Sequence, residues 1–182
     1  MAPAPGNHRL GPESGSLVVK TYREGVVAKV GHDLVIEVTR WEATVDIAAD
    51  VARSTVALTA DPRSLAVREG VRGVKPLTDK DRSEILKTID AKVLRGQPIS
   101  FRSTAVHPVD GGGGLVVEGD LTLSGSTGPV TGQLDLDADG RVSGTIALAQ
   151  SAWGIKPYRG LMGALKVRDE IEIVIASRLP VV

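Results

Sequence analysis

The sequence predicts a mainly β protein: a single antiparallel up-and-down β-barrel of about eight strands with one α-helix. Three observations predict this fold. Apolar and polar residues alternate with a period of two over most of residues 99–175, as in strands packed on one face and wet on the other. Short glycine-rich connections separate these runs, so strands adjacent in sequence are expected to be hairpin neighbours. Only one stretch has helical spacing. Closing such a sheet removes exposed edges and leaves an interior that can hold one small ligand.

The N-terminal third is predicted to be an arm followed by the first strands. Residues 1–15 are rich in Pro, Gly and small polar residues without periodicity, which predicts a flexible arm before one domain at residues 16–182. Strands are expected at residues 16–22, 26–30 and 34–47. In the last run the apolar residues change from even to odd positions near residues 39–40. We expect a β-bulge there, as in a curving barrel; two short strands joined by a bend are the alternative.

The helix is expected at residues 77–95, because these residues place four apolar side chains on one face. They are Ile85, Leu86, Ile89 and Val93. Thr78 with Asp81 three residues later is typical of a helix N-terminus, and Gly96 is typical of a stop. Residues 62–76 carry basic side chains around glycines, which predicts an irregular, solvated loop.

The C-terminal half is predicted to be a series of hairpins. Its strands are expected within residues 99–103, 115–123, 130–136, 142–148 and 171–175. The turns between them are expected at residues 111–114, 125–128 and 137–140. A β-sandwich has the same periodicity, so periodicity alone leaves it as an alternative to the barrel.

Composition excludes several function classes. The 22 Lys and Arg balance 22 Asp and Glu, so no excess of positive charge favours nucleic acid as a partner. The absence of Cys excludes disulfides and thiolate chemistry. No apolar run is long enough for a transmembrane segment, and no signal peptide is recognisable in the sequence as given. We therefore expect a cytoplasmic protein, unless an export signal was removed. The oligomeric state stays open, a homodimer included.

Several segments resemble one family. The run GDLTLSGSTGPVTGQLDL at residues 119–136 resembles a strand pair of the YceI-like family of isoprenoid-lipid-binding proteins. Residues 31–45, 97–101 and 151–155 and the closing strand at 169–175 are similar to further family motifs, in the same order and spacing. The chain departs from the family pattern at Ser124, where the family often has His, and at Gln150, where it often has Arg.

The resemblance implies a lipocalin-like barrel that binds a long polyisoprenoid, a quinone precursor or a related lipid for storage or transport. It implies no covalent chemistry, so we expect neither an enzyme nor a cofactor. Alternation identifies inward-facing residues, and the helix contributes two more if it faces the pore. The expected ligand-binding residues are Leu34, Ile36, Leu86, Ile89, Phe101, Leu121, Leu123, Ile146, Leu148 and Trp153. The alternative is a ligand-free structural or protein-interaction module whose barrel core is packed solid.

Polar head-group contacts are expected near one unusual connection. Residues 153–164, WGIKPYRGLMGA, combine Trp, Tyr, Met and two cations with Gly and Pro. Trp153 either lines the cavity mouth or plugs one barrel end, and the two cations either meet a head group or are solvated. His32 either contacts a head group or hydrogen-bonds Asp33. The candidate head-group residues are His32, Lys156 and Arg159.

Neither a metal site nor a catalytic residue is expected. His8 falls in the arm and His107 at a strand end, which favours surface positions. The dipeptide His32-Asp33 occurs in metal phosphohydrolases, but their chemistry needs further His and Asp ligands at helical spacing, and this segment is predicted to be β. No serine occupies a nucleophile turn between a strand and a helix. The glycine run at residues 111–114 lacks the Lys-Ser/Thr of a phosphate loop.

Overall fold

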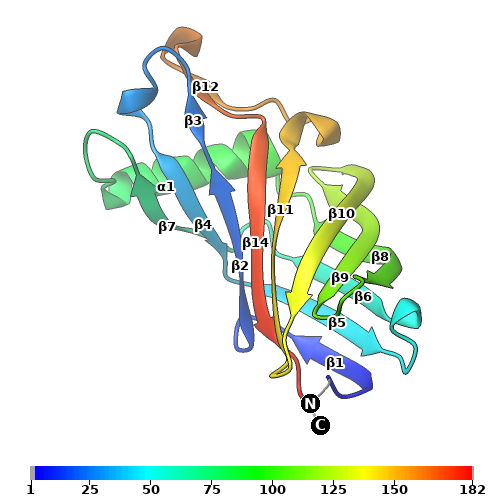
Figure 1. Ribbon diagram of the computed structural model, residues 1–182. Coiled ribbons are helices and arrows are strands. Elements are labelled where there is room, and N and C mark those ends of the chain that lie inside the picture. Colours follow the sequence, from blue (N-terminus) through cyan, green and yellow to red (C-terminus); the bar gives the residue numbers. More distant parts are fainter. Residues whose placement is uncertain (1–2, 182) are drawn as a thin grey trace.

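A long curled antiparallel sheet dominates the protein, as the computed structural model describes it over residues 3–181 (Figure 1). Fourteen strands occur among these residues. Eleven form one sheet in the order β1-β5-β6-β8-β9-β10-β11-β14-β2-β4-β7, which curls into a half-barrel. The other three form a small sheet, β12-β13-β3, at one end. The mainly β architecture with one α-helix is confirmed. The sheet is a half-barrel with β1 and β7 at its edges and not a closed barrel, and a count of about eight strands was too low.

The strands and helices are numbered in their order along the chain. The large sheet contains β1 (Gly6–Leu10), β2 (Gly15–Thr21), β4 (Asp33–Val38), β5 (Trp41–Ile47), β6 (Thr55–Ala60), β7 (Leu65–Val71), β8 (Ile99–Pro108), β9 (Gly114–Leu123), β10 (Ser126–Leu136), β11 (Arg141–Ala149) and β14 (Glu170–Arg178). The small sheet contains β3 (Arg23–Glu24), β12 (Arg159–Gly160) and β13 (Leu165–Val167). The helix α1 (Asp79–Thr88) continues as a π-helical turn at Ile89–Leu94. Short 3-10 turns lie at Ala28–Val30, Val51–Arg53, Gln150–Trp153 and Leu161–Gly163.

One bend in the chain connects the two opposite edges of the sheet, so the sheet must curl to bring these edges near each other. Strand β4 pairs with β2 and β7 near one end of the order, and β5 pairs with β1 and β6 at the other. Only Thr39 and Arg40 separate β4 from β5. The change of parity in the sequence therefore marks two strands joined by a bend, and the β-bulge expected at residues 39–40 was wrong. The register irregularities lie elsewhere, between Val35 and Ile36 and between Ser103 and Ala105.

The bend is fastened to a second corner of the chain, between β6 and β7. The backbone N–H of Thr39 donates to the carbonyl of Ser64 at 2.8 Å, and the N–H of Asp61 donates to the carbonyl of Arg40 at 3.0 Å. The Arg40 guanidinium also contacts the Asp61 carboxylate at 2.6 Å. These bonds satisfy backbone groups that leave the ladder at the bend.

The two edge strands of the large sheet were missed because their sequences show no clear alternation. Residues 6–10, assigned to a flexible arm, form β1 and pair with β5 from Gly6 opposite Ile47 onwards. Only Leu10 of this strand is buried. Residues 65–71, assigned to a solvated loop, form β7 and pair with β4. Strand β7 lies at an edge of the sheet, where charged side chains are tolerated. Residues 1 and 2 of the predicted arm lie outside the described part of the chain.

The helix begins where the sequence predicts. The Thr78 hydroxyl accepts from the N–H of Asp81 at 3.1 Å, and the Asp81 carboxylate accepts from the N–H of Thr78 at 2.9 Å, which is a complete capping box. After ten residues the backbone widens into the π-helical turn and ends at Arg95, whose φ is 54°. One predicted helix is therefore two consecutive helical segments. No helix within residues 3–181 has the length and apolar character needed to cross a membrane.

Two clusters of buried residues lie in the half-barrel. One cluster contains Leu10, Leu17, Val38, Trp41, Ala43, Ala60 and Leu179. The other contains Leu94, Leu123, Leu148, Trp153, Ile155 and Ile171, and it joins the helix to β9, β11 and β14.

The hairpins predicted in the C-terminal half connect β8 to β9, β9 to β10 and β10 to β11. The middle one is a two-residue turn at Ser124 and Gly125, both with positive φ.

Candidate ligand-binding cavity

The interior of the half-barrel is hollow. A cavity of about 1000 Å³ extends along it, lined by inward-facing residues of the strands and by one face of the helical segment. This volume is at the upper end of the range for small-molecule sites, roughly 300–1,000 Å³. Protein interiors are normally close-packed with few voids larger than a water molecule, so a space of this size argues against the packed-core alternative.

Glycines in the strands help to keep the cavity open. A side chain at Gly132 would begin 2.5 Å from Cδ1 of Ile146, and one at Gly119 would begin 2.5 Å from the ring of Phe101. The two large side chains therefore lie flat over neighbouring backbone that carries no side chain. In a strand, glycine often marks such a close approach. The apolar walls are formed without filling the space between them.

The helical segment is fastened over the cavity at both ends. The Arg82 guanidinium donates to the carbonyls of Val67, at 2.5 Å, and Arg68, at 3.0 Å, on β7. At the other end the Ser124 hydroxyl donates to the carbonyl of Val93 at 2.7 Å, and Arg95 donates to the Ser124 carbonyl at 2.8 Å. Ser124, one of the departures from the family pattern, thus joins the β9–β10 turn to the end of the helix.

The charged side chains of the cavity lining all lie at one end, called here the mouth end. There it is bordered by β3, the loop before β4, the residues between β7 and α1, and the small sheet. The basic side chains at this end of the lining are Arg23, His32, Lys75 and Lys166, and the acidic ones are Asp81 and Glu84. The rest of the lining is almost entirely apolar. A ligand with one polar end and a long apolar body matches this distribution.

Hydrogen bonds set the charge of two groups near the mouth. The backbone N–H of Thr78, followed by its hydroxyl, holds the pKa of the Asp81 carboxyl below its ordinary value of 3.8. The hydrogen bond from the Tyr22 hydroxyl to Glu172, 2.5 Å long, raises the pKa of Tyr22, and burial adds to the effect. The Arg168 guanidinium lies 5.9 Å from the centre of the Tyr22 ring. Asp81 is therefore ionised and Tyr22 neutral at pH 7.

The structure brings most of the predicted ligand-binding residues together around the cavity. Those that line it are Leu34, Ile36, Ile89, Phe101, Leu121, Leu123, Ile146 and Leu148. His32 lines it as well, at the mouth end. Its Nε2 lies 2.5 Å from the carbonyl oxygen of Lys75, while Asp33 instead accepts from the N–H of Arg23 at 2.8 Å. Contact of these residues with a ligand stays a prediction.

Four predicted residues lie outside the cavity lining. Leu86 lies on a flank of α1, because the face turned to the cavity carries Ile85 and Ile89. Trp153 is 4 % exposed and packs in the second buried cluster, where its indole N–H donates to the carbonyl of Leu121 at 2.9 Å. It fills a barrel end, the structural interpretation of that residue. Lys156 and Arg159 are exposed on the outside of the mouth.

Three cations at the mouth were missed. Arg23 lies on β3 and Lys166 on β13, two paired strands of the small sheet, and both side chains line the cavity. The sequence pattern does not reveal this sheet because these strands are only two and three residues long. Lys75 falls in the stretch that was interpreted as a solvated loop. An excess of basic residues in that stretch was the one signal that could have identified it.

Gln150, the second departure from the family pattern, is buried. Its side chain donates to the carbonyl of Arg168 at 2.9 Å and so holds the end of β11 to the residues before β14.

The three histidines lie at separate places and form no common site. His8 bonds the carbonyl of Ala4 at 2.6 Å, and His107 lies 3.9 Å from the Glu118 carboxylate. Within residues 3–181 no three His, Asp or Glu side chains are placed to hold one metal ion.

Comparisons with known proteins agree with this geometry. A family model described as the YceI-like domain matches residues 14–179. The fold is similar to the crystal structure of Burkholderia cenocepacia BcnA, with 18 % identity and a TM-score of 0.63 over 88 % of this chain and 94 % of that one. It is also similar to a mutant of the CJ YCEI protein with a monobromobimane guest, at 11 % identity and a TM-score of 0.58, covering 80 % of this chain and 85 % of that one. No curated protein matches the sequence.

Proposed function

The chain belongs to the YceI-like family, and from this premise we propose that it binds a long-chain apolar ligand, such as a polyisoprenoid or a related lipid, in its cavity without covalent chemistry. The observation that carries the proposal is the apolar cavity of about 1000 Å³. Burial of apolar surface contributes about 25 cal/mol per Å², so a long chain that is insoluble in water gains much from such a space. The polyisoprenoid is favoured by the family, which is known as a lipocalin-like polyisoprenoid-binding fold.

The polar mouth supports an orientation for this ligand. Its apolar chain lies along the strands, and its head group stays at the mouth beside Arg23, Lys75 and Lys166. These three cations outnumber the two carboxylates of Asp81 and Glu84 that border the same end. An anionic head group fits that balance better than a neutral one. A polyprenyl phosphate is therefore expected to bind more tightly than the matching polyprenol.

The test fills the cavity and measures uptake of a fluorescent polyprenyl probe. Ile146 lines the cavity on β11, and the next residue on the outer face of the same strand, Thr145, is exposed. Ile146→Trp is expected to weaken probe binding at least about tenfold, because the larger ring occupies the space of the chain. Thr145→Trp is the matched control and is expected to bind as wild type does.

Two further readouts complete the test. Thermal melts establish that both tryptophan variants are folded, and mass spectrometry of an organic extract of the purified protein identifies any ligand carried through purification. Equal probe binding by folded Ile146→Trp and wild type would contradict a cavity site. A probe that binds neither wild type nor variant, with no lipid in the extract, would contradict the function itself.

A further inference from the structure

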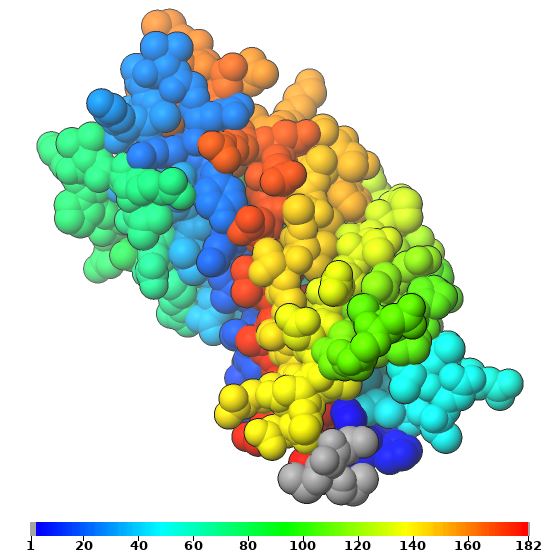
Figure 2. Space-filling view, viewed as in Figure 1, coloured from blue at the N-terminus to red at the C-terminus, as the bar shows by residue number. Residues whose placement is uncertain are grey.

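Exposed apolar side chains gather at the mouth end, on two loops that touch each other. Val26 and Met162 are almost fully exposed, at 95 % and 108 %, and two further residues are more than half exposed. A 3.2 Å hydrogen bond from the backbone N–H of Val27 to the carbonyl of Ala164 joins the loops. Figure 2 shows both loops, one blue and one orange, projecting together from one end of the molecule. The apolar tip is defined as Val26, Val30, Leu161 and Met162.

The backbone of the second loop is unfavourable for the residues it carries. Leu161 has a φ of 49° and Met162 a φ of 53°, both in the left-handed region. Turns with this backbone are normally built from Gly, Asn or Asp. Here they display two large apolar side chains to water instead. Strain and exposure at one place indicate a binding surface, since neither stabilises the fold.

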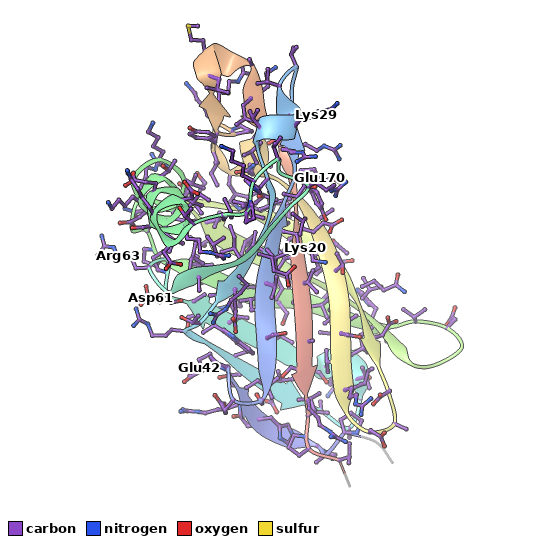
Figure 3. All side chains as sticks on the ribbon, turned by 90° about the vertical axis from the view of Figure 1, so that its left-hand side faces the viewer. Lys20, Lys29, Glu42, Asp61, Arg63 and Glu170 are labelled. Carbon is purple, nitrogen blue, oxygen red and sulfur yellow. The ribbon has the colours of Figure 1, made fainter. Side chains whose placement is uncertain are left out.

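Positive charge surrounds the apolar tip. The three loop segments at this end, residues 23–31, 72–77 and 156–167, contain seven Lys and Arg against one carboxylate, Glu24. The remainder of the chain has fifteen Lys and Arg against twenty-one Asp and Glu. Figure 3 shows Lys29 at the outer end of the molecule, far from Glu42. The basic collar is defined as Arg23, Lys29, Arg72, Lys75, Lys156, Arg159 and Lys166.

Two carboxylates next to the collar are held in hydrogen bonds. Asp33 accepts from the backbone of Arg23 and pairs with the Arg72 guanidinium at 2.5 Å. Asp169 accepts from the N–H of Ser151 at 2.7 Å and from its hydroxyl at 2.5 Å. Arg72 is thereby partly neutralised. The other six cations of the collar still outnumber Glu24 and the carboxylates of Asp81 and Glu84, which border the mouth from α1.

The tip, the collar and the cavity mouth form one continuous surface. Val30 belongs to the tip and also lines the cavity, and Lys166 belongs to the collar and also lines it. Tyr158, 40 % exposed, lies on the same rim. An aromatic ring with one polar end suits the boundary between lipid and water.

We propose that the apolar tip and the basic collar dock the mouth end on the surface of a bilayer that contains anionic lipids. Apolar side chains inserted at the head-group level and cations beside them each strengthen such binding. The cavity mouth then opens toward the lipid, where a long apolar ligand can pass without crossing water. A symmetric dimer through the same surface would bring collar against collar, so charge favours the bilayer over a second copy.

The test is sedimentation of the full chain with vesicles of phosphatidylcholine, with or without phosphatidylglycerol. Wild type is expected to bind the anionic vesicles, more weakly as salt is added, and to bind the neutral ones poorly. Val26→Ser/Met162→Ser is expected to lose at least about tenfold in binding, since each buried side chain of this size contributes about one order of magnitude. Lys29→Glu/Lys156→Glu is expected to lose at least about fivefold per charge.

The controls lie at the opposite end of the molecule. They are Val51→Ser, at a side chain that is 38 % exposed, and Arg53→Glu in the same turn. Both variants are expected to bind anionic vesicles as wild type does. Vesicles without ligand are used, and probe uptake without vesicles is expected to be unchanged in Val26→Ser/Met162→Ser. Docking and ligand binding are therefore measured separately.

Three outcomes would overturn the proposal. The first is that anionic vesicles retain no wild-type protein at any salt concentration. The second is that the tip and collar variants bind as well as wild type does. Alternatively, analytical ultracentrifugation shows a concentration-dependent dimer that Val26→Ser/Met162→Ser abolishes while vesicle binding persists. In that case a second copy, and not a bilayer, is the partner of the apolar tip.

Discussion

The two ends of the half-barrel are built on the same strands but differ in their loops. The loops of the far end, residues 48–54, 109–113 and 137–140, contain four Asp and one Arg. Their carboxylates bond their own backbone: Asp137 accepts from the N–H groups of Asp139 and Arg141, both at 2.9 Å. The mouth-end loops have instead the apolar tip, the basic collar and the polar rim of the cavity. Side chains that satisfy a turn stabilise it, and those that do not are available to a partner.

The difference shows where function is placed in this fold. Alternation of apolar and polar residues continues along the strands to both ends and does not distinguish them. The turns of the far end are short and polar, and Val51 is the one exposed large apolar side chain in them. The mouth end is assembled from segments distant in sequence, and its exposure costs stability. The predictions below test how far the two ends differ, from the largest expected effect to the smallest.

The largest effect on stability is expected at Trp153, which packs in the second buried cluster. Trp153→Ala is expected to lower the free energy of unfolding by about 3–5 kcal/mol, because it leaves a space in a buried cluster and an unpaired carbonyl at Leu121. Trp41 borders the cavity, so Trp41→Ala enlarges an existing space. It is expected to cost less than Trp153→Ala. Urea unfolding measures both, and an equal or larger cost at Trp41 would contradict the different roles of the two rings.

Two glycines with similar backbones compare the turns at the two ends. Gly140, with φ 77°, lies in the far-end turn, where a side chain would collide with the carbonyl of Leu179. Gly163, with φ 88°, lies beside the apolar tip, where a side chain would meet nothing within 4 Å. Gly163→Ala is expected to cost about 1–2 kcal/mol from the left-handed backbone alone. Gly140→Ala is expected to cost at least about 1 kcal/mol more, because the turn must also shift.

Thermal or urea unfolding of the two Ala variants measures this comparison. Equal costs would mean that the far-end turn is as adaptable as the mouth-end loop. A larger cost at Gly163 would reverse the comparison between a tight end and an open one.

The smallest effect is expected at Asp81, beside the mouth. Its pKa is lowered in the folded protein, so the carboxylate stabilises the fold above its ordinary pKa of 3.8 and loses this contribution as the pH falls through the folded pKa. Asp81→Asn is expected to be less stable than wild type near pH 7, with a difference that shrinks as the pH falls below 3.8.

Urea unfolding across this pH range is the measurement. Asp79→Asn, which removes a carboxylate from the same first turn but leaves the capping box intact, is the control. A difference for Asp81→Asn that stays constant with pH would contradict the capping role of the carboxylate.

Regular alternation made much of the fold predictable. Strands such as β9, β10 and β11 were found because one face is apolar and the other wet, and the capping box of Thr78 located the helix. The short strands β3, β12 and β13 could not be found in this way, because two or three residues carry no periodicity. The edge strands β1 and β7 were missed because apolar and polar residues do not alternate clearly along them. For the site, alternation identified wall residues such as Leu121 and Ile146 but not the cations of the mouth.

The sequence by itself determined the mainly β architecture, the helix start and the inward-facing residues of the long strands, because these depend on neighbours in the chain. Only the tertiary structure decided that the inward faces enclose a space, since that depends on the distance between strands far apart in sequence. It also decided that Trp153 packs behind the cavity wall, in a buried cluster whose other members line the cavity, and that Arg23, Lys75 and Lys166 share one mouth. Residues from separate loops meet there through the curl of the sheet, and no local pattern records that meeting.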